Sequence, residues 1–406
     1  EGREAPKGEG IASQANPDRQ QEPPALNRVC SIFYQLTELF PRSEFRRAVE
    51  AHRAERHARG FSCWAQFLAM LFCQLAQAQS LREISNGLAC SEGKLRHLGL
   101  ESAPKRSTLA YANQHRPWQL YQTLFEQLYE KCRSEFDQAR RQGRLRGRRF
   151  RFRNPLVSLD ASIIYLVEKA FDWADYHRGK GAIKLHLALD HQGFLPRLAV
   201  ISQANEPEVN VARRWKFPRG TVLLCDKGYV DYRWYDRLTA EGVFFVTRER
   251  SKAAVEVLER RKPVGERVLA DEVIRLGAQR NRMKAPLRRI VLEPPSADRP
   301  ITLLTNHFEW DAETVAELYR QRWEIEQFFR TLKQNLRVKT FVGTSANAVL
   351  IQVWTALIAL LLLRFMMLRA QYHWSLSNLI ALLRMQLFVY RDLWEWLNEP
   401  FRPPPP

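Results

Sequence analysis

The chain has 406 residues, more than the roughly 250 to 300 that one hydrophobic core usually holds, so we expect about two to three domains. Lysine and arginine together number 63 against 44 aspartate and glutamate residues, which gives a formal net charge of +19. This balance argues against an enzyme of neutral small molecules and points to a polyanionic partner. The basic residues are spread along the chain, which favours nucleic acid over a membrane surface; a merely soluble basic surface is the alternative.

The first part of the chain is expected to be a disordered leader followed by helices. Residues 1–25 are polar and contain proline and glycine, without the basic-then-apolar order of a signal peptide. From residue 26 to 139, apolar side chains recur at spacings of three and four, as at Phe61, Trp64 and Phe67. This periodicity predicts an α-helical domain.

Two segments of this domain together resemble a helix-turn-helix. Ser80-Leu-Arg-Glu predicts a capped short helix that Gly87 ends. Lys105-Arg-Ser-Thr then predicts another helix that a serine or threonine caps, with basic residues just before it. Lys105 and Arg106 are therefore candidate DNA contacts, and plain helical packing is an equally good explanation of the pattern.

A strongly basic segment follows the helical domain. Eight of the fourteen residues 140–153 are arginine, with Phe150 and Phe152 interleaved. A solvated charge run is the usual explanation of such a segment. Because the alternation leads directly into an apolar run, we expect a phosphate-contacting linker that becomes an edge strand, with Arg148 and Arg149 as candidate DNA contacts.

The sequence pattern then changes from one typical of helices to one typical of strands, which predicts a mixed α/β sheet. Residues 140–248 form its expected first part, residues 249–301 a β-rich insertion, and residues 302–370 its second part. The apolar stretch 346–368 contains Gln352 and Arg364, so we expect a buried core helix and no membrane span. Residues 371–406 are expected to form a helical segment and a proline-rich tail. The expected strands are 156–159, 183–189, 194–201, 221–225 and 243–247.

Two aspartates end short apolar runs, Leu-Val-Ser-Leu-Asp160 and Val-Leu-Leu-Cys-Asp226. A carboxylate beside a buried strand is costly unless a cation, an arginine or backbone donors compensate its charge. Asp190 ends a similar run, but the following His-Gln-Gly predicts a hairpin loop, and aspartate favours the first position of a turn. No turn signal follows Asp160, so Asp160 and Asp226 are the better candidates for a functional site.

A third candidate acid, Glu326, lies on a long helix expected from about Asp311 to Arg337. Tyr319, Arg322, Glu326 and Lys333 share one face of that helix, because they are three, four and seven residues apart. An apolar stripe lies beside this face, which places Glu326 at the margin of the core and leaves Arg322 and Lys333 available to phosphates. A solvated face with ordinary salt bridges would be preferred for this helix taken alone. The apolar stripe consists of Leu318, Ile325, Phe329, Leu332 and Leu336.

Phosphodiester chemistry gives three such acids a common purpose. Two Mg²⁺ ions about 3.5 to 4 Å apart can activate an attacking oxygen and stabilise a leaving one, and hard cations prefer oxygen ligands. No cluster of histidine and cysteine with zinc-ligand spacing appears in the sequence.

The chain resembles the DDE transposases of bacterial insertion sequences, in particular the insertion-sequence-four family. Tyr319, Arg322, Glu326 and Lys333 match the Tyr-x2-Arg-x3-Glu-x6-Lys signature of that family at every spacing. The two preceding acids of the family match Asp160 in Ser-Leu-Asp-Ala-Ser and Asp226 in Cys-Asp-Lys-Gly-Tyr. Lys180-Gly-Ala-Ile-Lys-Leu-His is similar to the second strand of the family, and the resemblance covers about residues 26–368.

The resemblance implies a ribonuclease-H-like core with the β-rich insertion between Asp226 and Glu326, and a helical N-terminal domain that binds transposon ends. Asp160, Asp226 and Glu326 would be catalytic metal ligands, for two Mg²⁺ ions or for Mn²⁺ in their place. Tyr319, Arg322 and Lys333 would contact DNA phosphates. If a hairpin intermediate forms, a tryptophan would hold a flipped base, and the candidates are Trp215, Trp310 and Trp323.

We therefore expect cut-and-paste transposition in the bacterial cytoplasm, at the nucleoid. The expected partners are double-stranded DNA, as terminal inverted repeats and as target, and a second copy of the chain, because two ends must be paired. Two alternatives remain at this point: a ribonuclease-H-like nuclease that only hydrolyses DNA, and a DNA-binding protein without catalytic activity.

Overall fold

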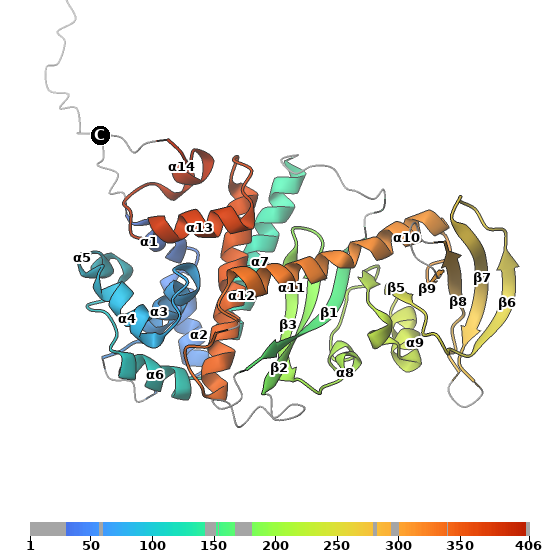
Figure 1. Ribbon diagram of the computed structural model, residues 1–406, viewed down its shortest axis with the longest axis horizontal. Helices are drawn as coiled ribbons and strands as arrows, with labels where there is room; N and C mark the ends of the chain where they lie inside the picture. Colours follow the sequence, from blue (N-terminus) through green and yellow to red (C-terminus); the bar gives the residue numbers. More distant parts are fainter. Residues whose placement is uncertain are drawn as a thin grey trace, which may run out of the picture.

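A computed structural model describes residues 30–56, 60–142, 152, 154–166, 181–278, 282–293, 300–338 and 340–402. The expected leader, Arg148, Arg149 and the prolines at 403–406 lie outside these residues. The described chain forms a helical part and a part built on one large sheet (Figure 1).

The predicted N-terminal domain is helical over its described residues. Its apolar side chains at three- and four-residue spacing are buried together, as Trp64, Phe67 and Leu68 illustrate on the third helix. The helices are α1 (Ile32–Thr37), α2 (Arg42–Ala51), α3 (Cys63–Leu75), α4 (Leu81–Ala89), α5 (Glu92–Leu95), the 3-10 helix η1 (Arg96–Leu98), α6 (Arg106–His115) and α7 (Gln119–Arg141).

Two details of the predicted helix-turn-helix differ from expectation. Ser80 does cap α4, since its hydroxyl accepts from the Glu83 amide at 3.2 Å, but the helix continues past Gly87 to Ala89. Gly87 instead permits close packing, because a Cβ there would lie 2.9 Å from the ring of Phe72. No serine or threonine caps α6: it begins at Arg106, after Lys105, whose extended backbone makes no side-chain cap bond.

The last helices pack back onto the first ones. The long apolar helix α12 (Ala346–Arg369) contacts α3, α6 and α7 as well as the sheet strand β3 (Leu195–Gln203). By length and composition α12 could cross a membrane, but 89% of its apolar window is buried inside the protein, which confirms the predicted core helix. The remaining helices are α13 (Leu376–Gln386) and α14 (Leu393–Asn398).

A nine-stranded mixed sheet forms the second part, in the order β3-β2-β1-β4-β5-β9-β8-β7-β6. The five strands expected from the sequence are all present, and the expected insertion supplies β6, β7 and β8, which extend the same sheet through β9. With β3 given above, the strands are β1 (Leu156–Tyr165), β2 (Ala182–Asp190), β4 (Val222–Leu224), β5 (Phe244–Arg248), β6 (Val255–Arg261), β7 (Val268–Leu276), β8 (Leu287–Leu292) and β9 (Ile301–Thr305).

The strand that follows the arginine-rich segment is central, so the prediction of an edge strand was wrong. β1 pairs antiparallel with β2 on one side and parallel with β4 on the other. The first residues of β1, from Leu156 to Ser158, are thereby paired on both sides, and Val157 and Leu159 are fully buried. The edges of the sheet are β3 and β6.

Helices pack on both faces of the sheet around β1, β4 and β5, and the helices of residues 312–335 run across one of these faces (Figure 1). Alternating residues of β1 divide between two clusters: Val157 packs with α9 (Tyr232–Ala240), and Leu156 packs with α10 (Ala312–Gln321). The expected helix 311–337 is interrupted only at Arg322, which separates α10 from α11 (Trp323–Asn335). Its predicted stripe, from Leu318 to Leu336, is buried.

Candidate active site

Asp160 lies in the middle of β1, not at its end as the apolar run suggested. The strand continues to Tyr165 because β2 pairs with it along its whole length, from Val157 with Asp190 to Tyr165 with Ala182. Strand residues alternate between faces, so Asp160 shares a face with Leu156, on the side that α10 covers. Its carboxylate accepts a hydrogen bond from the Ala161 amide at 2.8 Å.

Asp226 follows the carboxyl end of β4, one strand away. Its side chain accepts from the Gly228 amide at 2.7 Å and caps the 3-10 helix η4 (Lys227–Tyr229). The last parallel pair of the two strands is Ser158 with Leu224, two residues before Asp160 and Asp226. The two carboxylates are close enough for Asp226 to raise the pKa of Asp160. Asp160 on the sheet and Asp226 just beyond the end of β4 are therefore neighbours.

Glu326 reaches this region from α11, which contacts β1. Its carboxylate forms an ion pair with Arg322, one turn earlier on the same helical face. The Arg322 guanidinium also lies 5.8 Å from the centre of the Tyr319 ring. Three signature residues thus contact one another, as their spacing predicted.

The structure gives both Arg322 and Lys333 partners within the protein, and their contacts with DNA phosphates stay a prediction. Arg322 is paired with Glu326, and Lys333 donates to the backbone carbonyl of Ile163 on β1 at 2.7 Å. The reason is proximity: α11 docks on β1 closely enough for a lysine to reach the strand's backbone. Lys333 therefore fastens the helix that carries Glu326 to the strand that carries Asp160.

The surroundings of Asp160 disfavour the negative charge of its ionised carboxylate. Burial raises the pKa of Asp160 to about 7, the Ala161 amide and Arg322 lower it, and the carboxylates of Asp226 and Glu208 raise it. Among the described residues, neither Asp160 nor Asp226 takes part in a salt bridge. Two neighbouring carboxylates without a paired cation favour a bound positive charge.

The donor set suits a hard divalent cation, although the acids do not yet converge on one point. Carboxylate oxygens are the ligands that Mg²⁺ and Mn²⁺ prefer, and the side chains here offer oxygen rather than nitrogen or sulfur. Within the described ranges, no three acidic, histidine or cysteine side chains are close enough together to hold one ion. Glu326 would have to leave Arg322 to join the two aspartates.

Comparison with known proteins shows which family the chain belongs to. Residues 151–362, about half of the chain, match the family model described as "Transposase DDE domain". The chain belongs to the DDE transposases. Residues 29–101 also match a family described as "Domain of unknown function (DUF4372)".

Several relatives of this transposase come from bacterial insertion sequences. A Sinorhizobium fredii protein named as transposase y4zB is 33% identical over 269 residues, which cover 64% of this chain and 71% of that one. A Geobacillus stearothermophilus protein, named as the transposase for insertion sequence element IS5377, is 30% identical over 64% of this chain and 67% of its own length. A Synechocystis protein named as the transposase for element IS4SA is 20% identical over 60% and 70%.

A solved structure also resembles the transposase over most of its length. It is described as the piggyBac transposase synaptic complex with hairpin DNA, and it covers 88% of this chain and 80% of its own at 12% identity. The TM-score is 0.45, and a score below 0.5 does not establish a common fold.

The family assigns the activity in general terms. This protein is a transposase that binds DNA and catalyses DNA cleavage and strand transfer, and the reaction depends on a divalent metal. A nuclease without strand transfer and a DNA-binding protein without activity are no longer needed as explanations of the sequence.

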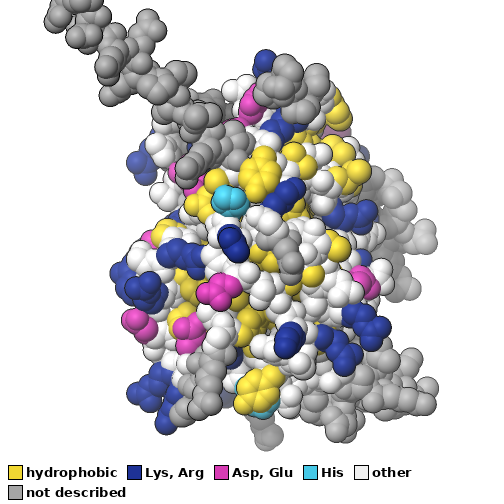
Figure 2. Space-filling model, turned by 90° about the vertical axis from the view of Figure 1, so that its left-hand side faces the viewer, with side chains coloured by type: hydrophobic (Ala, Val, Ile, Leu, Met, Phe, Trp, Pro, Cys, Tyr) yellow, Lys and Arg dark blue, Asp and Glu magenta, His cyan; other side chains and the backbone are white. Residues whose placement is uncertain are grey.

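Two of the basic residues predicted to contact DNA lie in the helical part, apart from the acids. Lys105 and Arg106 are exposed at the start of α6, in the helical part. Figure 2 shows lysine and arginine side chains spread over the end of the molecule formed by that part, with few acids between them. Arg148 and Arg149 lie outside the described residues.

The three candidate tryptophans differ in accessibility. Trp323, the first residue of α11, is 51% exposed beside Arg322. Trp310 is stacked on His307 with ring centres 3.6 Å apart and on Phe152 at 4.8 Å, so both of its faces are occupied. Trp215 is partly buried and packs against the apolar cluster beneath α9.

Asp190 serves the turn that the sequence predicted. Its carboxylate accepts from the Gln192 amide at 2.8 Å, which closes the turn between β2 and β3. The hairpin explains this acid without any role in catalysis.

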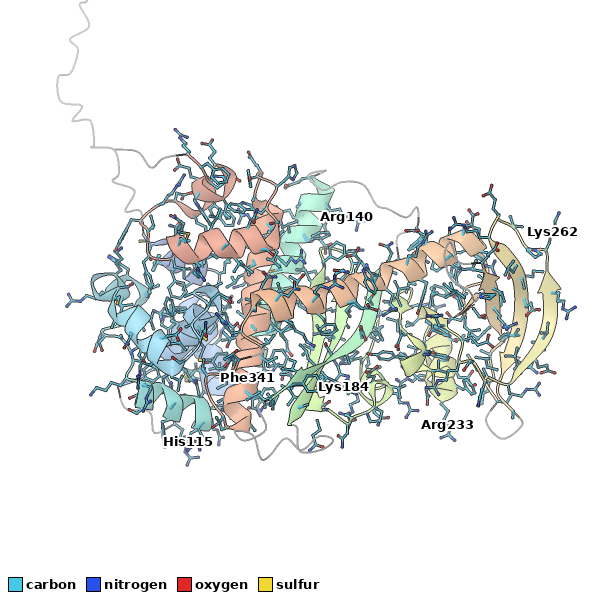
Figure 3. All side chains as sticks on the ribbon, in the orientation of Figure 1. His115, Arg140, Lys184, Arg233, Lys262 and Phe341 are labelled. Carbon is cyan, nitrogen blue, oxygen red and sulfur yellow. The ribbon has the colours of Figure 1, made fainter. Side chains whose placement is uncertain are left out.

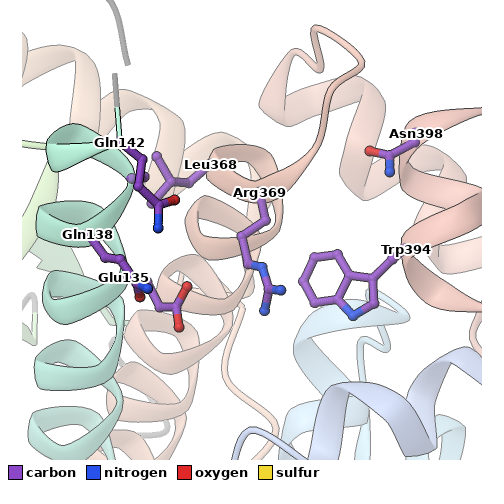
Figure 4. Close-up of a pocket in the computed structure, with 8 residues that line it drawn as sticks. Glu135, Gln138, Gln142, Leu368, Arg369, Trp394 and Asn398 are labelled. Carbon is purple, nitrogen blue, oxygen red and sulfur yellow. The ribbon is translucent and has the colours of Figure 1, made fainter. Parts of the chain in front are cut away.

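A cavity in the described part of the chain lies away from these acids. It has a volume of about 390 Å³ and lies where the ends of α7 and α12 meet α14 (Figure 4). The Arg369 guanidinium in its wall lies 4.3 Å from the centre of the Trp394 ring. The cavity contains none of the candidate acids, so it is not the site of phosphodiester chemistry.

Sequence reasoning missed Glu208, the first residue of the short helix α8 (Glu208–Ala212). Its carboxylate is near enough to Asp160 and Asp226 to influence their charges. The only sequence signal was an acid after a proline, outside any strand, and such residues are common at helix starts.

Proposed function

We propose that this transposase cuts DNA at the ends of its own insertion sequence and joins the 3′-hydroxyl ends to a target, with Asp160, Asp226 and Glu326 as ligands of two Mg²⁺ ions. The observation that carries the proposal is the proximity of Asp160 on β1 to Asp226, which follows the parallel neighbour β4, with the Arg322–Glu326 pair on the helix docked beside them. Mn²⁺ would substitute, because it accepts the same oxygen ligands.

The strand order supports a ribonuclease-H-like core for this reaction. β3, β2 and β1 form an antiparallel meander, and β4 and β5 continue parallel to β1, so the carboxyl end of β4 presents Asp226 beside Asp160. In open α/β sheets, ligands bind outside the carboxyl ends of the strands. The helical N-terminal part is proposed to bind the terminal repeats.

Each residue would have a definite role. Asp160 would hold the metal as a carboxylate, a form that its raised pKa disfavours in the absence of a nearby positive charge. Glu326 would be a ligand only when it is not paired with Arg322, and the unpaired guanidinium would be available to a DNA phosphate. When bound, two divalent ions activate the attacking oxygen and stabilise the leaving one.

The proposal extends to the assembly around the site. Two ends must be cut and joined together, so the active form would be a homodimer on DNA, in the bacterial cytoplasm at the nucleoid. If the excised end closes as a hairpin, Trp323 is the best placed of the three tryptophans to stack a flipped base, because it is exposed beside the Arg322–Glu326 pair.

A strand-transfer assay tests the joining step. A pre-cut duplex terminus with a free 3′-hydroxyl is incubated with the protein, a circular plasmid and Mg²⁺ or Mn²⁺. We expect joined products with either metal and none with EDTA or with Glu326→Gln. Nicked plasmid and shortened duplex without joined molecules would contradict the proposed transfer.

A further inference from the structure

A fourth acid faces the two aspartates from a different element. Glu208 begins α8, which contacts both β1 and η4. A Cβ on Gly228 would lie 2.9 Å from an Asp226 carboxylate oxygen and 3.2 Å from Oε2 of Glu208. Because both carboxylate oxygens lie close to this one Cβ position, they also lie close to each other beside Gly228. Asp226 and Glu208 therefore share one small space.

The charge around this space is unbalanced. Lys184 on β2 lies 3.8 Å from Oε1 of Glu208 and also donates to the Glu206 carbonyl at 2.9 Å. On the other side, Arg322 is occupied by Glu326. Within the described part of the chain, Glu208 and Glu326 pair with these two cations, whereas Asp160 and Asp226 have no ion-pair partner. Unpaired, partly buried carboxylates favour a bound cation.

A buried hydroxyl gives a second, independent indication. The Tyr229 side chain is 1% exposed, and its hydroxyl has no hydrogen-bond partner among the residues that the structure describes. Burial raises the pKa of this hydroxyl, and the carboxylates of Glu208 and Asp160 are the nearby charges that raise it most. Buried hydroxyl groups are normally hydrogen-bonded, and an orphaned one calls for an explanation such as a missing water or ion. A water bound to a cation between Glu208 and the aspartates would donate a hydrogen bond to the Tyr229 hydroxyl and so supply the missing partner.

We propose that Glu208 is a fourth acidic residue of the active site, an oxygen donor that faces the divalent cation from α8. In the metal-free protein, Lys184 holds the Glu208 carboxylate in place. The inference rests on the proposed function, because it assigns Glu208 to the same metal site as Asp160 and Asp226. It does not depend on which DNA is cut.

Binding of Mn²⁺ to the full-length protein tests this directly, since loss of the free-ion signal in electron paramagnetic resonance measures binding without any reaction. The variants are Glu208→Gln, Asp160→Asn and, as a matched control, Glu206→Gln. Glu206 is a near neighbour of similar exposure, 29% against 27% for Glu208, but it pairs with Arg214. Melting curves in EDTA establish that each variant is folded.

We expect Asp160→Asn to abolish Mn²⁺ binding, Glu208→Gln to weaken it by about tenfold or more, and Glu206→Gln to leave it within about twofold. Lys184→Gln should leave binding equal or tighter, because it removes a competing cation. Wild-type affinity in Glu208→Gln, with binding lost in Asp160→Asn, would overturn the inference and leave the proposed function standing. Absence of Mn²⁺ binding in the wild type would overturn both.

Discussion

At the scale of single residues, Asp160 is the side chain whose environment says most about the site. It is a carboxylate placed in the interior of a central strand, and burial raises its pKa to about 7 against an ordinary value of 3.8. The native state therefore holds a proton that the unfolded chain releases. Without metal, ionisation of Asp160 must cost folding free energy.

Asp160→Asn is expected to stabilise the metal-free protein at alkaline pH. A raised native pKa gives stability that is present below pH 4 and lost as pH rises to about 7, and at pH 8 the loss is ~4 kcal/mol at most. Thermal melting in EDTA should show the variant melting a few degrees above wild type at pH 8, with a difference that shrinks toward pH 4. A pH-independent difference would show that Asp160 is not strained by its charge. Added Mg²⁺ should raise the melting temperature of wild type only.

The spacing of residues predicted which side chains share a helical face but not what they touch. Tyr319, Arg322 and Glu326 are grouped as the 3.6-residue period requires. Whether Lys333 meets solvent or the Ile163 carbonyl depends on how closely α11 docks on β1. Glu208 was missed for the same kind of reason, because only the tertiary fold brings α8 beside η4.

At the scale of elements, the sequence located strands better than it located their ends. Apolar runs bounded by turn residues identified β1 to β5, since burial on both faces requires such runs. β1 nevertheless extends six residues beyond the expected Leu159, because β2 offers a paired partner over that length. Strand pairing depends on two strands, so the sequence pattern of β1 alone could not predict it. The same pairing places β1 in the interior of the sheet and not at its edge.

The first turn of α6 gives a prediction at this scale. The double variant Lys105→Gln with Arg106→Gln should bind a duplex carrying the element's terminus more weakly, and its log–log dependence of affinity on salt should be shallower by about two. Both side chains are exposed at the helix start. Fluorescence anisotropy at several salt concentrations measures both quantities.

The matched control changes two exposed cations far from α6. Arg260 and Lys262 lie at the end of β6, at the other extremity of the molecule from His115 of α6 (Figure 3). Arg260→Gln with Lys262→Gln removes the same charge and should leave the salt dependence unchanged. Equal weakening by the two double variants would mean that α6 contributes only general charge and packing.

At the scale of the whole molecule, contacts between distant segments decide the architecture. α12 follows the Glu326 helix in sequence and was expected to complete the sheet domain, yet it packs mainly on α3, α6 and α7. Ser31 near the start of the described chain pairs with Tyr390 near its end. Apolar character predicted that α12 is buried, but the sequence holds no signal for the partner that buries it.

The sheet is likewise one structure although the sequence suggested a core with an insertion. β9 pairs with β5 on one side and β8 on the other, so the strands from residues 249–301 are continuous with those that carry the aspartates. Motif spacing could predict the candidate acids because metal-dependent chemistry requires carboxylates. Whether the insertion joins the core sheet depends on hydrogen bonds between strands, which the spacing does not show.

Metal-dependent cleavage of a labelled duplex carrying the element's terminus tests the central claim most directly. Wild type is compared with Asp160→Asn, Asp226→Asn and Glu326→Gln in Mg²⁺ and in EDTA, with Asp190→Asn as the control acid that serves only a turn. We expect cleavage by wild type and Asp190→Asn in Mg²⁺ alone, and a loss of at least about a hundredfold in each of the other three, all folded. Undiminished cleavage by any one of those three, or a collapse in Asp190→Asn, would contradict the assignment of the site.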